Sequence, residues 1–133
     1  MSVMIAKKLL LAIILLGKTL VFEAAITPNQ KSKGLMYRKD WGQIDGMIFV
    51  NTEPMQVTFW MKNTYLDMVT LYMDKEYNIL EVYHPAPLSE ELLVSKSTDV
   101  MYVLEIKPEL SNMIVGNPSE FKTAMENANP VEQ

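Results

Sequence analysis

Short apolar, β-branched and aromatic runs separated by turn residues make up most of the chain. This pattern is typical of β-strands, and it occurs at residues 19–27, 47–51, 56–63, 67–74, 79–84 and 99–107. The connections are short, so we expect antiparallel pairing, because parallel strands need a long crossover. The run at 99–107 is apolar on both faces, which predicts a central strand.

Two stretches carry the residues that begin helices. Thr27, Pro28 and Gln30 are ordered as an N-cap, a first-turn proline and a capping-box glutamine, which predicts a short helix. Asn117 and Pro118 repeat the arrangement, and apolar residues follow at helical spacing. The predicted fold is therefore α+β and mostly antiparallel. We expect a compact small sheet sandwich or partly open barrel, with a short helix after the first strand and a C-terminal helix.

Length and composition indicate one globular domain. The chain has 133 residues, of which 49% are hydrophobic. We divide it into a signal-like or anchoring segment (1–17), a single β-rich domain (18–117) and a C-terminal helix and tail (118–133). The absence of cysteine excludes disulfides, thiolate nucleophiles and Cys-ligated metal sites. A net charge of −4 without a basic stripe argues against nucleic acid as a partner.

The N-terminal residues bear on location. Lys7 and Lys8 precede an unbroken apolar run at residues 9–16, which is the order of a secretory signal. The run is too short to span a bilayer, which needs roughly 20 residues. We predict export or membrane anchoring on the periplasmic side, with residues 5–17 as the attachment. The alternative is a buried N-terminal helix or strand of a cytoplasmic protein.

Polar side chains interrupt the strands around residues 60–67. Strand alternation places Trp60 and Lys62 on one face and Asn63 on the other. Asp67 and Glu105 each fall on an apolar face of their predicted strand. A carboxylate in that position is costly unless it is paired.

Arg38 is the preferred partner for these carboxylates, because a guanidinium forms two parallel hydrogen bonds. We therefore expect a polar cluster at one end of the fold. The predicted ligand-binding residues are Arg38, Trp60, Lys62, Asn63, Asp67 and Glu105. The alternative is an ion-pair and hydrogen-bond network that only fixes loop geometry.

Four sequence pieces occur in a specific order: KGLMYR (33–38), DGMIFV (45–50), FWMKNTYLDM (59–68) and YVLE (102–105). With these pieces the chain resembles the domain of unknown function 192 family, from about Leu20 to Asn117. The resemblance implies a mostly antiparallel β fold with a helix near its start. Members often carry a signal peptide, which supports export. The resemblance implies no established activity.

The chain departs from the family pattern at two positions. Two residues of the usual pattern are missing between Thr64 and Asp67, so the loop that carries Asp67 is shorter. The usual V-G-D near the end is Val115-Gly116-Asn117 here, which removes a charge.

The remaining residues suggest no reaction. His84 is the only histidine, and one histidine does not complete a zinc or copper site. The eleven methionines are interpreted as core residues. We predict no cofactor, no metal and no catalytic residue.

Three hypotheses remain. The first is a non-enzymatic, envelope-associated binding module, with a polar pocket beside Trp60 that takes a small polar ligand or a protein partner. The second is a small hydrolase with Asp67 and Glu105 as an acid/base pair. The third is a structural scaffold without a ligand.

Overall fold

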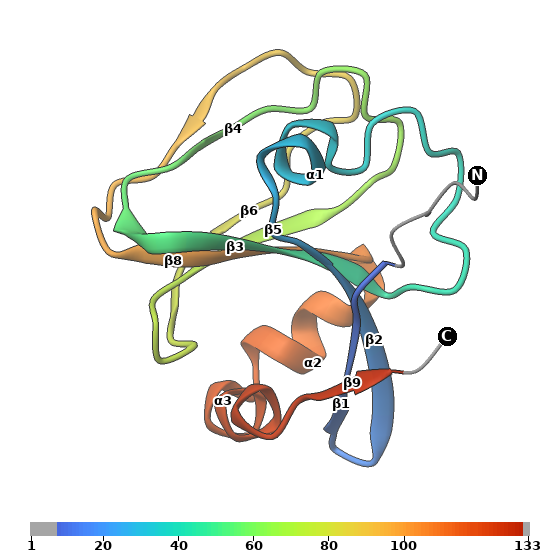
Figure 1. Cartoon of the computed structure of the whole chain (residues 1–133), viewed down its shortest axis with the longest axis vertical. Coiled ribbons are helices and arrows are strands. Elements are labelled where there is room, and N and C mark those ends of the chain that lie inside the picture. The colour runs from blue at the N-terminus through green and yellow to red at the C-terminus, as the bar shows by residue number, and fades with distance from the viewer. Residues whose placement is uncertain (1–7, 132–133) are drawn as a thin grey trace, which may run out of the picture.

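A seven-stranded open sheet runs through the computed structural model, which describes residues 8–131 (Figure 1). In spatial order its strands are β6 (Ile79–Tyr83), β5 (Val69–Met73), β8 (Val100–Ile106), β3 (Gly46–Met55), β2 (Lys18–Ala25), β1 (Leu10–Leu15) and β9 (Asn129–Val131). All neighbouring strands are antiparallel except β2 and β3. The mostly antiparallel α+β prediction is confirmed, and the sheet does not close into a barrel. Strand β8 is central, as predicted.

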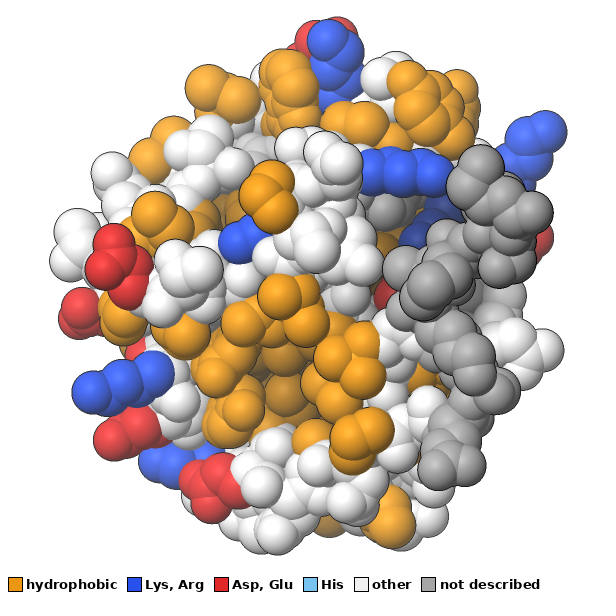
Figure 2. All heavy atoms as spheres, viewed as in Figure 1, with side chains coloured by type: hydrophobic (Ala, Val, Ile, Leu, Met, Phe, Trp, Pro, Cys, Tyr) orange, Lys and Arg blue, Asp and Glu red, His pale blue; other side chains and the backbone are white. Residues whose placement is uncertain are grey.

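Helical and sheet elements cover the two faces of this sheet. One face carries α1 (Pro28–Lys33) and a second, two-stranded sheet of β4 (Thr58–Phe59) and β7 (Leu93–Val94). The other face carries the 3-10 helix Pro108–Leu110, α2 (Ser111–Val115) and α3 (Pro118–Glu126), seen below the sheet in Figure 1. On that side Figure 2 shows a hollow of hydrophobic side chains.

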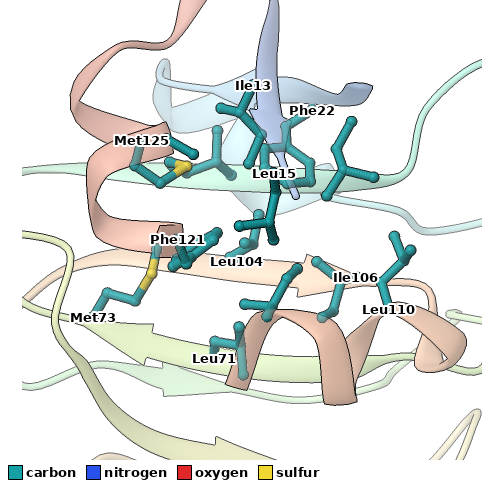
Figure 3. Close-up of a cluster of buried hydrophobic side chains, with 14 of the residues drawn as sticks. Ile13, Leu15, Phe22, Leu71, Met73, Leu104, Ile106, Leu110, Phe121 and Met125 are labelled. Atoms are coloured by element: carbon teal, nitrogen blue, oxygen red, sulfur yellow. The ribbon is translucent and has the colours of Figure 1, made fainter. Parts of the chain in front are cut away.

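A large core lies between the main sheet and α3. Strand alternation sends Leu104 and Ile106 into this core and Val103 to the opposite face. Phe121 and Met125 of α3 pack against the sheet, as their helical spacing predicts (Figure 3). This packing fixes β8 in position from below, so its other side chains are held against the α1 face.

The apolar run at residues 9–16 provides strand β1. A two-residue turn at Leu16 and Gly17, both with positive φ (50° and 80°), joins β1 to β2. Ile13 and Leu15 are buried, whereas Ile14 is exposed. The structure therefore includes this run in the domain, which differs from the predicted boundary at residue 18. A buried N-terminal strand is the alternative that the sequence left open.

Export remains a prediction, and residues 1–7, including Lys7, lie outside the described part of the chain. Among the described residues, no helix is long and apolar enough to cross a membrane.

The helix starts follow the sequence closely. Gln30 donates its backbone N–H to Thr27 Oγ1 (3.2 Å), and Gln30 Oε1 accepts the backbone N–H of Thr27 (3.0 Å), so the predicted capping box is present. Asn117 does not cap α3 with its side chain, because Asn117 Nδ2 donates to the Met113 carbonyl instead (2.9 Å). Strand β9, which pairs with β1, was not predicted.

Candidate functional site

A row of four side chains crosses the α1 face of the main sheet. Strand register places Glu23 of β2 opposite Met47 of β3, Met47 opposite Glu105 of β8, and Glu105 opposite Thr70 of β5. Directly opposite residues project from the same face. The sheet therefore carries two carboxyl groups and a hydroxyl group on a face whose other buried side chains are largely apolar.

Glu23 has its charge fully compensated. The guanidinium of Arg38 forms a bidentate pair with it, with Nη1–Oε1 at 3.0 Å and Nη2–Oε2 at 2.8 Å, and Lys8 Nζ lies 3.7 Å from Oε1. Burial raises the pKa of Glu23, but the hydrogen bonds and charge of Arg38 outweigh it, so the net pKa is lowered. Glu23 is therefore a structural anion that holds Arg38.

Glu105 has the opposite environment. Glu105 is only 5% exposed. No described residue donates a hydrogen bond to its carboxyl group or forms an ion pair with it. Burial alone raises its pKa to about 8. Glu105 therefore holds a proton at neutral pH, and its polar atoms have no protein partner in the described part of the chain.

The hydroxyl group beside Glu105 also lacks a partner. Thr70 is 1% exposed, and its Oγ1 is the buried side-chain oxygen for which the described residues supply no hydrogen bond. More than about 90% of buried polar groups in proteins are hydrogen-bonded. Thr70 Oγ1 is such an exception, and it lies opposite Glu105, whose carboxyl group also has no hydrogen-bond partner among the described residues.

Glu105 lines a pocket between the α1 segment and the main sheet. The pocket has a volume of about 420 Å³, within the range of roughly 300–1,000 Å³ that is usual for small-ligand sites. Its wall combines apolar and aromatic side chains with a small number of polar ones. The lining residues are Lys31, Ser32, Lys33, Gly34, Leu35, Met36, Phe49, Asn51, Met55, Gln56, Val57, Thr58, Phe59, Trp60, Thr64 and Glu105.

Aromatic packing shapes one wall of the pocket. The rings of Phe49 and Phe59 meet edge to face, with their centroids 5.0 Å apart. The ring centroids of Phe59 and Tyr72 are 6.0 Å apart. Gly34 ends α1 with φ +48°, and a Cβ there would lie 3.2 Å from Phe49 Cζ. A glycine at this position therefore lets the end of α1 approach the aromatic wall.

Several polar lining groups already bind neighbouring backbone. Lys31 Nζ donates to the Val50 carbonyl (3.0 Å), Asn51 Nδ2 to the Val100 carbonyl (3.0 Å), and Gln56 Nε2 to the Ser95 carbonyl (2.8 Å). These bonds hold the strands around the pocket. In the view of Figure 2, basic side chains lie next to hydrophobic ones in the region of α1.

Of the six predicted site residues, Trp60 and Glu105 line the pocket together. Trp60 is 40% exposed, and Lys62 Nζ lies 5.1 Å from the centre of its ring, outside the pocket lining. The two residues that face the pocket come from separate motifs, FWMKNTYLDM and YVLE. The fold, rather than either motif alone, brings them together.

The predicted partner of Arg38 was wrong, although the predicted fork geometry is present. Arg38 binds Glu23 rather than Asp67 or Glu105. Asp67 is exposed and pairs with His84 Nε2 at 2.9 Å. The alternation argument failed for Asp67 because β5 begins at Val69, so Asp67 lies in the preceding loop. The structure does not bring Asp67 into the pocket that Glu105 lines, which removes the geometric basis for the acid/base pair.

Asn63 joins two of the motifs without entering the pocket. Asn63 Nδ2 donates to the hydroxyl of Tyr37 (2.9 Å), and the Tyr37 backbone N–H donates to the Asn63 carbonyl (2.8 Å). Both residues have left-handed backbone conformations, with φ of 54° and 67°. KGLMYR and FWMKNT therefore do lie side by side, and the pair that holds them is Tyr37 and Asn63.

Sequence reasoning missed Glu23 and Thr70. Glu23 is a single charge inside the apolar run TLVFEAA, so its position resembles that of Glu105 and could have been noticed. Thr70 carries no such signal, because threonine is common in strands. Among residues 8–131, no group of three or more His, Asp or Glu side chains is arranged to hold a metal ion.

Comparison with known families agrees with the motifs and the fold. The model of the domain of unknown function 192 family, described as an uncharacterized ACR, matches residues 14–115. The chain belongs to this family. No curated protein matches the chain.

Two crystal structures share the fold. One is a protein from Sinorhizobium meliloti 1021, provisionally described as a transcription regulator. It is 31% identical with a TM-score of 0.69, and the match covers 82% of this chain and 87% of that one. The other is a protein of unknown function from Novosphingobium aromaticivorans DSM 12444. It is 25% identical with a TM-score of 0.66, and the match covers 80% of this chain and 78% of that one.

Proposed function

We propose that this domain 192 protein is a non-enzymatic binding module that takes a small organic molecule in the pocket between α1 and the main sheet. The observation that carries this proposal is Glu105, a buried carboxyl group without a partner among the described residues that lines a cavity of about 420 Å³. A buried polar group costs stability unless it is hydrogen-bonded. A ligand that bonds to Glu105 offsets this cost, which provides a reason for the fold to retain it.

The surrounding wall suits a ligand with an apolar or aromatic body. Phe49, Phe59 and Trp60 supply ring surfaces, while Thr64 and Glu105 add polar groups. A largely apolar cavity with a few convergent polar groups is the usual form of a small-molecule site. The lining residues come from α1 and the turn after it, from β3 and β8, and from the segment around β4. Backbone pairing holds these strands in place.

The two tryptophans allow a direct test by NMR. Trp60 lines the pocket and Trp41 does not, so each reports on a different part of the protein. A library of small organic fragments, each at about 1 mM, covers the affinities expected of such weak ligands. We expect some fragments to shift the indole N–H resonance of Trp60 and leave that of Trp41 in place.

A matched pair of variants distinguishes the pocket from the rest of the surface. Thr58 and Val94 face each other across β4 and β7, and both are exposed, but only Thr58 lines the pocket. Thr58→Trp should fill the mouth of the pocket and abolish the fragment-induced shifts, whereas Val94→Trp should preserve them. Fragments that bind equally well to both variants, or a library without any binder, would contradict the proposal.

Location outside the cytoplasm is a separate proposal, supported by the order of Lys7, Lys8 and the apolar run that follows. Because β1 supplies buried Ile13 and Leu15, the exported protein should keep residues 10–15. The test fuses residues 1–30 to a reporter that is active only outside the cytoplasm, and an active fusion is expected. A soluble, inactive fusion would refute export.

A further inference from the structure

The charges around the pocket suggest which ligands it accepts. Arg38 is committed to Glu23 by two hydrogen bonds, and Lys31 Nζ is bonded to the Val50 carbonyl. Lys33 lies exposed on the α1 side of the pocket. Among the described residues no cation reaches Glu105. Glu23, two strands away in the same row of side chains, is by contrast fully paired.

We infer that the ligand itself supplies the cation: a small organic amine whose charged nitrogen binds Glu105 and whose apolar body lies against Phe49, Phe59 and Trp60. This inference rests on the proposed function, because it names the class of ligand for the same pocket.

Ammonium chemistry fits these groups better than an uncharged group does. An ammonium donates three hydrogen bonds and accepts none, and the ionised carboxylate of Glu105 that would pair with it only accepts them. A hydrogen bond between two ionised groups is roughly twice as strong as a neutral one. Phe49, Phe59 and Trp60 supply apolar contacts for the body of the amine. An uncharged ligand gains these contacts but not the bond between two ionised groups.

The proton balance of binding follows from the protonation of Glu105. At neutral pH Glu105 is protonated, so an amine that arrives as the ammonium ion displaces the Glu105 proton to solvent and forms a carboxylate–ammonium pair. Among the described residues, the other charged groups on this face include Glu23 with its partners Arg38 and Lys8, Glu81 of β6, and Lys31 and Lys33 of α1. Tyr72 and Tyr83 also face it, with raised pKa values that keep both phenols neutral.

This balance sets the sign of the pH dependence. Below the pKa of Glu105, each pH unit upward makes the carboxylate about tenfold more abundant, so amine affinity should rise by up to about tenfold per pH unit. Affinity should level off above pH 8, where Glu105 is already ionised. A neutral ligand that accepts a hydrogen bond from protonated Glu105 should instead lose affinity as the pH rises through the pKa of Glu105.

The lysines beside the pocket limit the charge that the rest of the ligand can carry. Lys31 and Lys33 lie on the α1 side of the pocket and repel a second positive charge. The ligand is therefore a monoamine whose outer end is neutral or anionic, rather than a polyamine. Its size is bounded by the pocket volume of about 420 Å³.

The test compares three probes of similar size with the full-length protein. They are 2-phenylethylamine, 2-phenylethanol and 3-phenylpropionate, which are cationic, neutral and anionic at pH 7. Each is titrated to about 10 mM, which reaches dissociation constants in the millimolar range. Binding is followed by the Trp60 indole resonance, with Trp41 as the internal reference. We expect the amine to bind at least about tenfold more tightly than the alcohol.

Two variants attribute the preference to Glu105. Glu105→Gln keeps the shape of the side chain and should remove both the amine preference and its pH dependence. Glu109→Gln makes the same substitution at an exposed position outside the pocket and should leave both in place. Retention of the preference in Glu105→Gln would overturn the inference.

The outcomes separate this inference from the proposed function. If the alcohol or other neutral fragments shift Trp60 as strongly as the amine does, the pocket is a binding site but the cation inference fails. If no amine shifts Trp60 while fragments of the general library do, the inference fails in the same way. If neither the library nor the probes shift Trp60, both the inference and the proposed function are wrong.

Discussion

Replacing Glu105 with glutamine should make the protein more stable at alkaline pH, which is unusual for a substitution in a core. The folded-state pKa of about 8 lies above the usual value of 4.5, so the folded protein holds one more proton than the unfolded chain between these values. The stability that this proton contributes is complete below pH 4.5 and is lost as the pH rises through 8.

The magnitude follows from the linkage relation. Each pH unit in this window removes about 1.4 kcal/mol of unfolding free energy. Between pH 6 and pH 8 the wild type should therefore lose about 2–3 kcal/mol that Glu105→Gln keeps. For a chain of this length such a difference shifts the melting temperature by about 10 °C.

The assay is urea unfolding of wild type and variant, followed by circular dichroism at intervals from pH 5 to pH 9. Titrations elsewhere affect both proteins, so the quantity of interest is the difference in unfolding free energy between them. This difference should change in favour of Glu105→Gln as the pH rises. For Glu109→Gln, at an exposed site, the unfolding free energy should change with pH in the same way as that of the wild type.

Glu23→Gln is a contrasting control on the same face of the sheet. Arg38 lowers the pKa of Glu23, so its stabilisation is present above pH 4.5 and is lost as the pH falls through the folded-state pKa. Glu23→Gln should therefore be destabilising at neutral pH and less so in acid. If the difference between wild type and Glu105→Gln stays constant from pH 5 to pH 9, the assignment of a raised pKa to Glu105 is refuted.

Three further predictions concern the polar pairs and the sheet, and each is measured by urea unfolding at pH 7. Arg38→Lys should cost about 1–2 kcal/mol, because lysine keeps the charge but loses the second hydrogen bond to Glu23; unchanged stability would show that the fork contributes nothing. Asp67→Ala should cost less than about 1 kcal/mol, because its contact with His84 is exposed, and a larger loss would point to a role that this contact does not explain. Gly46→Ala should cost about 3 kcal/mol, because the new Cβ would lie 2.5 Å from the Glu105 carbonyl oxygen and push β3 from β8; full stability would mean that the strands can shift freely.

The sequence alone determined the local features of this protein. The capping box at Thr27, the helical face of Phe121 and Met125, and the central position of β8 all depend on residues close together in the chain. Apolar periodicity and cap chemistry are short-range properties, so they could be predicted without knowing the fold. The family motifs likewise predicted the fold class, which the structure confirms.

Tertiary structure decided which polar groups meet. From the sequence, Arg38 had two candidate partners, Asp67 and Glu105, but in the folded chain it pairs with Glu23, which is placed by the strand register of the main sheet. The same register isolates Glu105 beside Thr70. Whether a buried carboxyl group is paired depends on residues tens of positions away, and a charge inside an apolar strand looks the same in either case. The sequence could therefore identify Glu105 as a candidate, but only the packed sheet distinguishes its unpaired carboxyl group from the ion-paired carboxylate of Glu23.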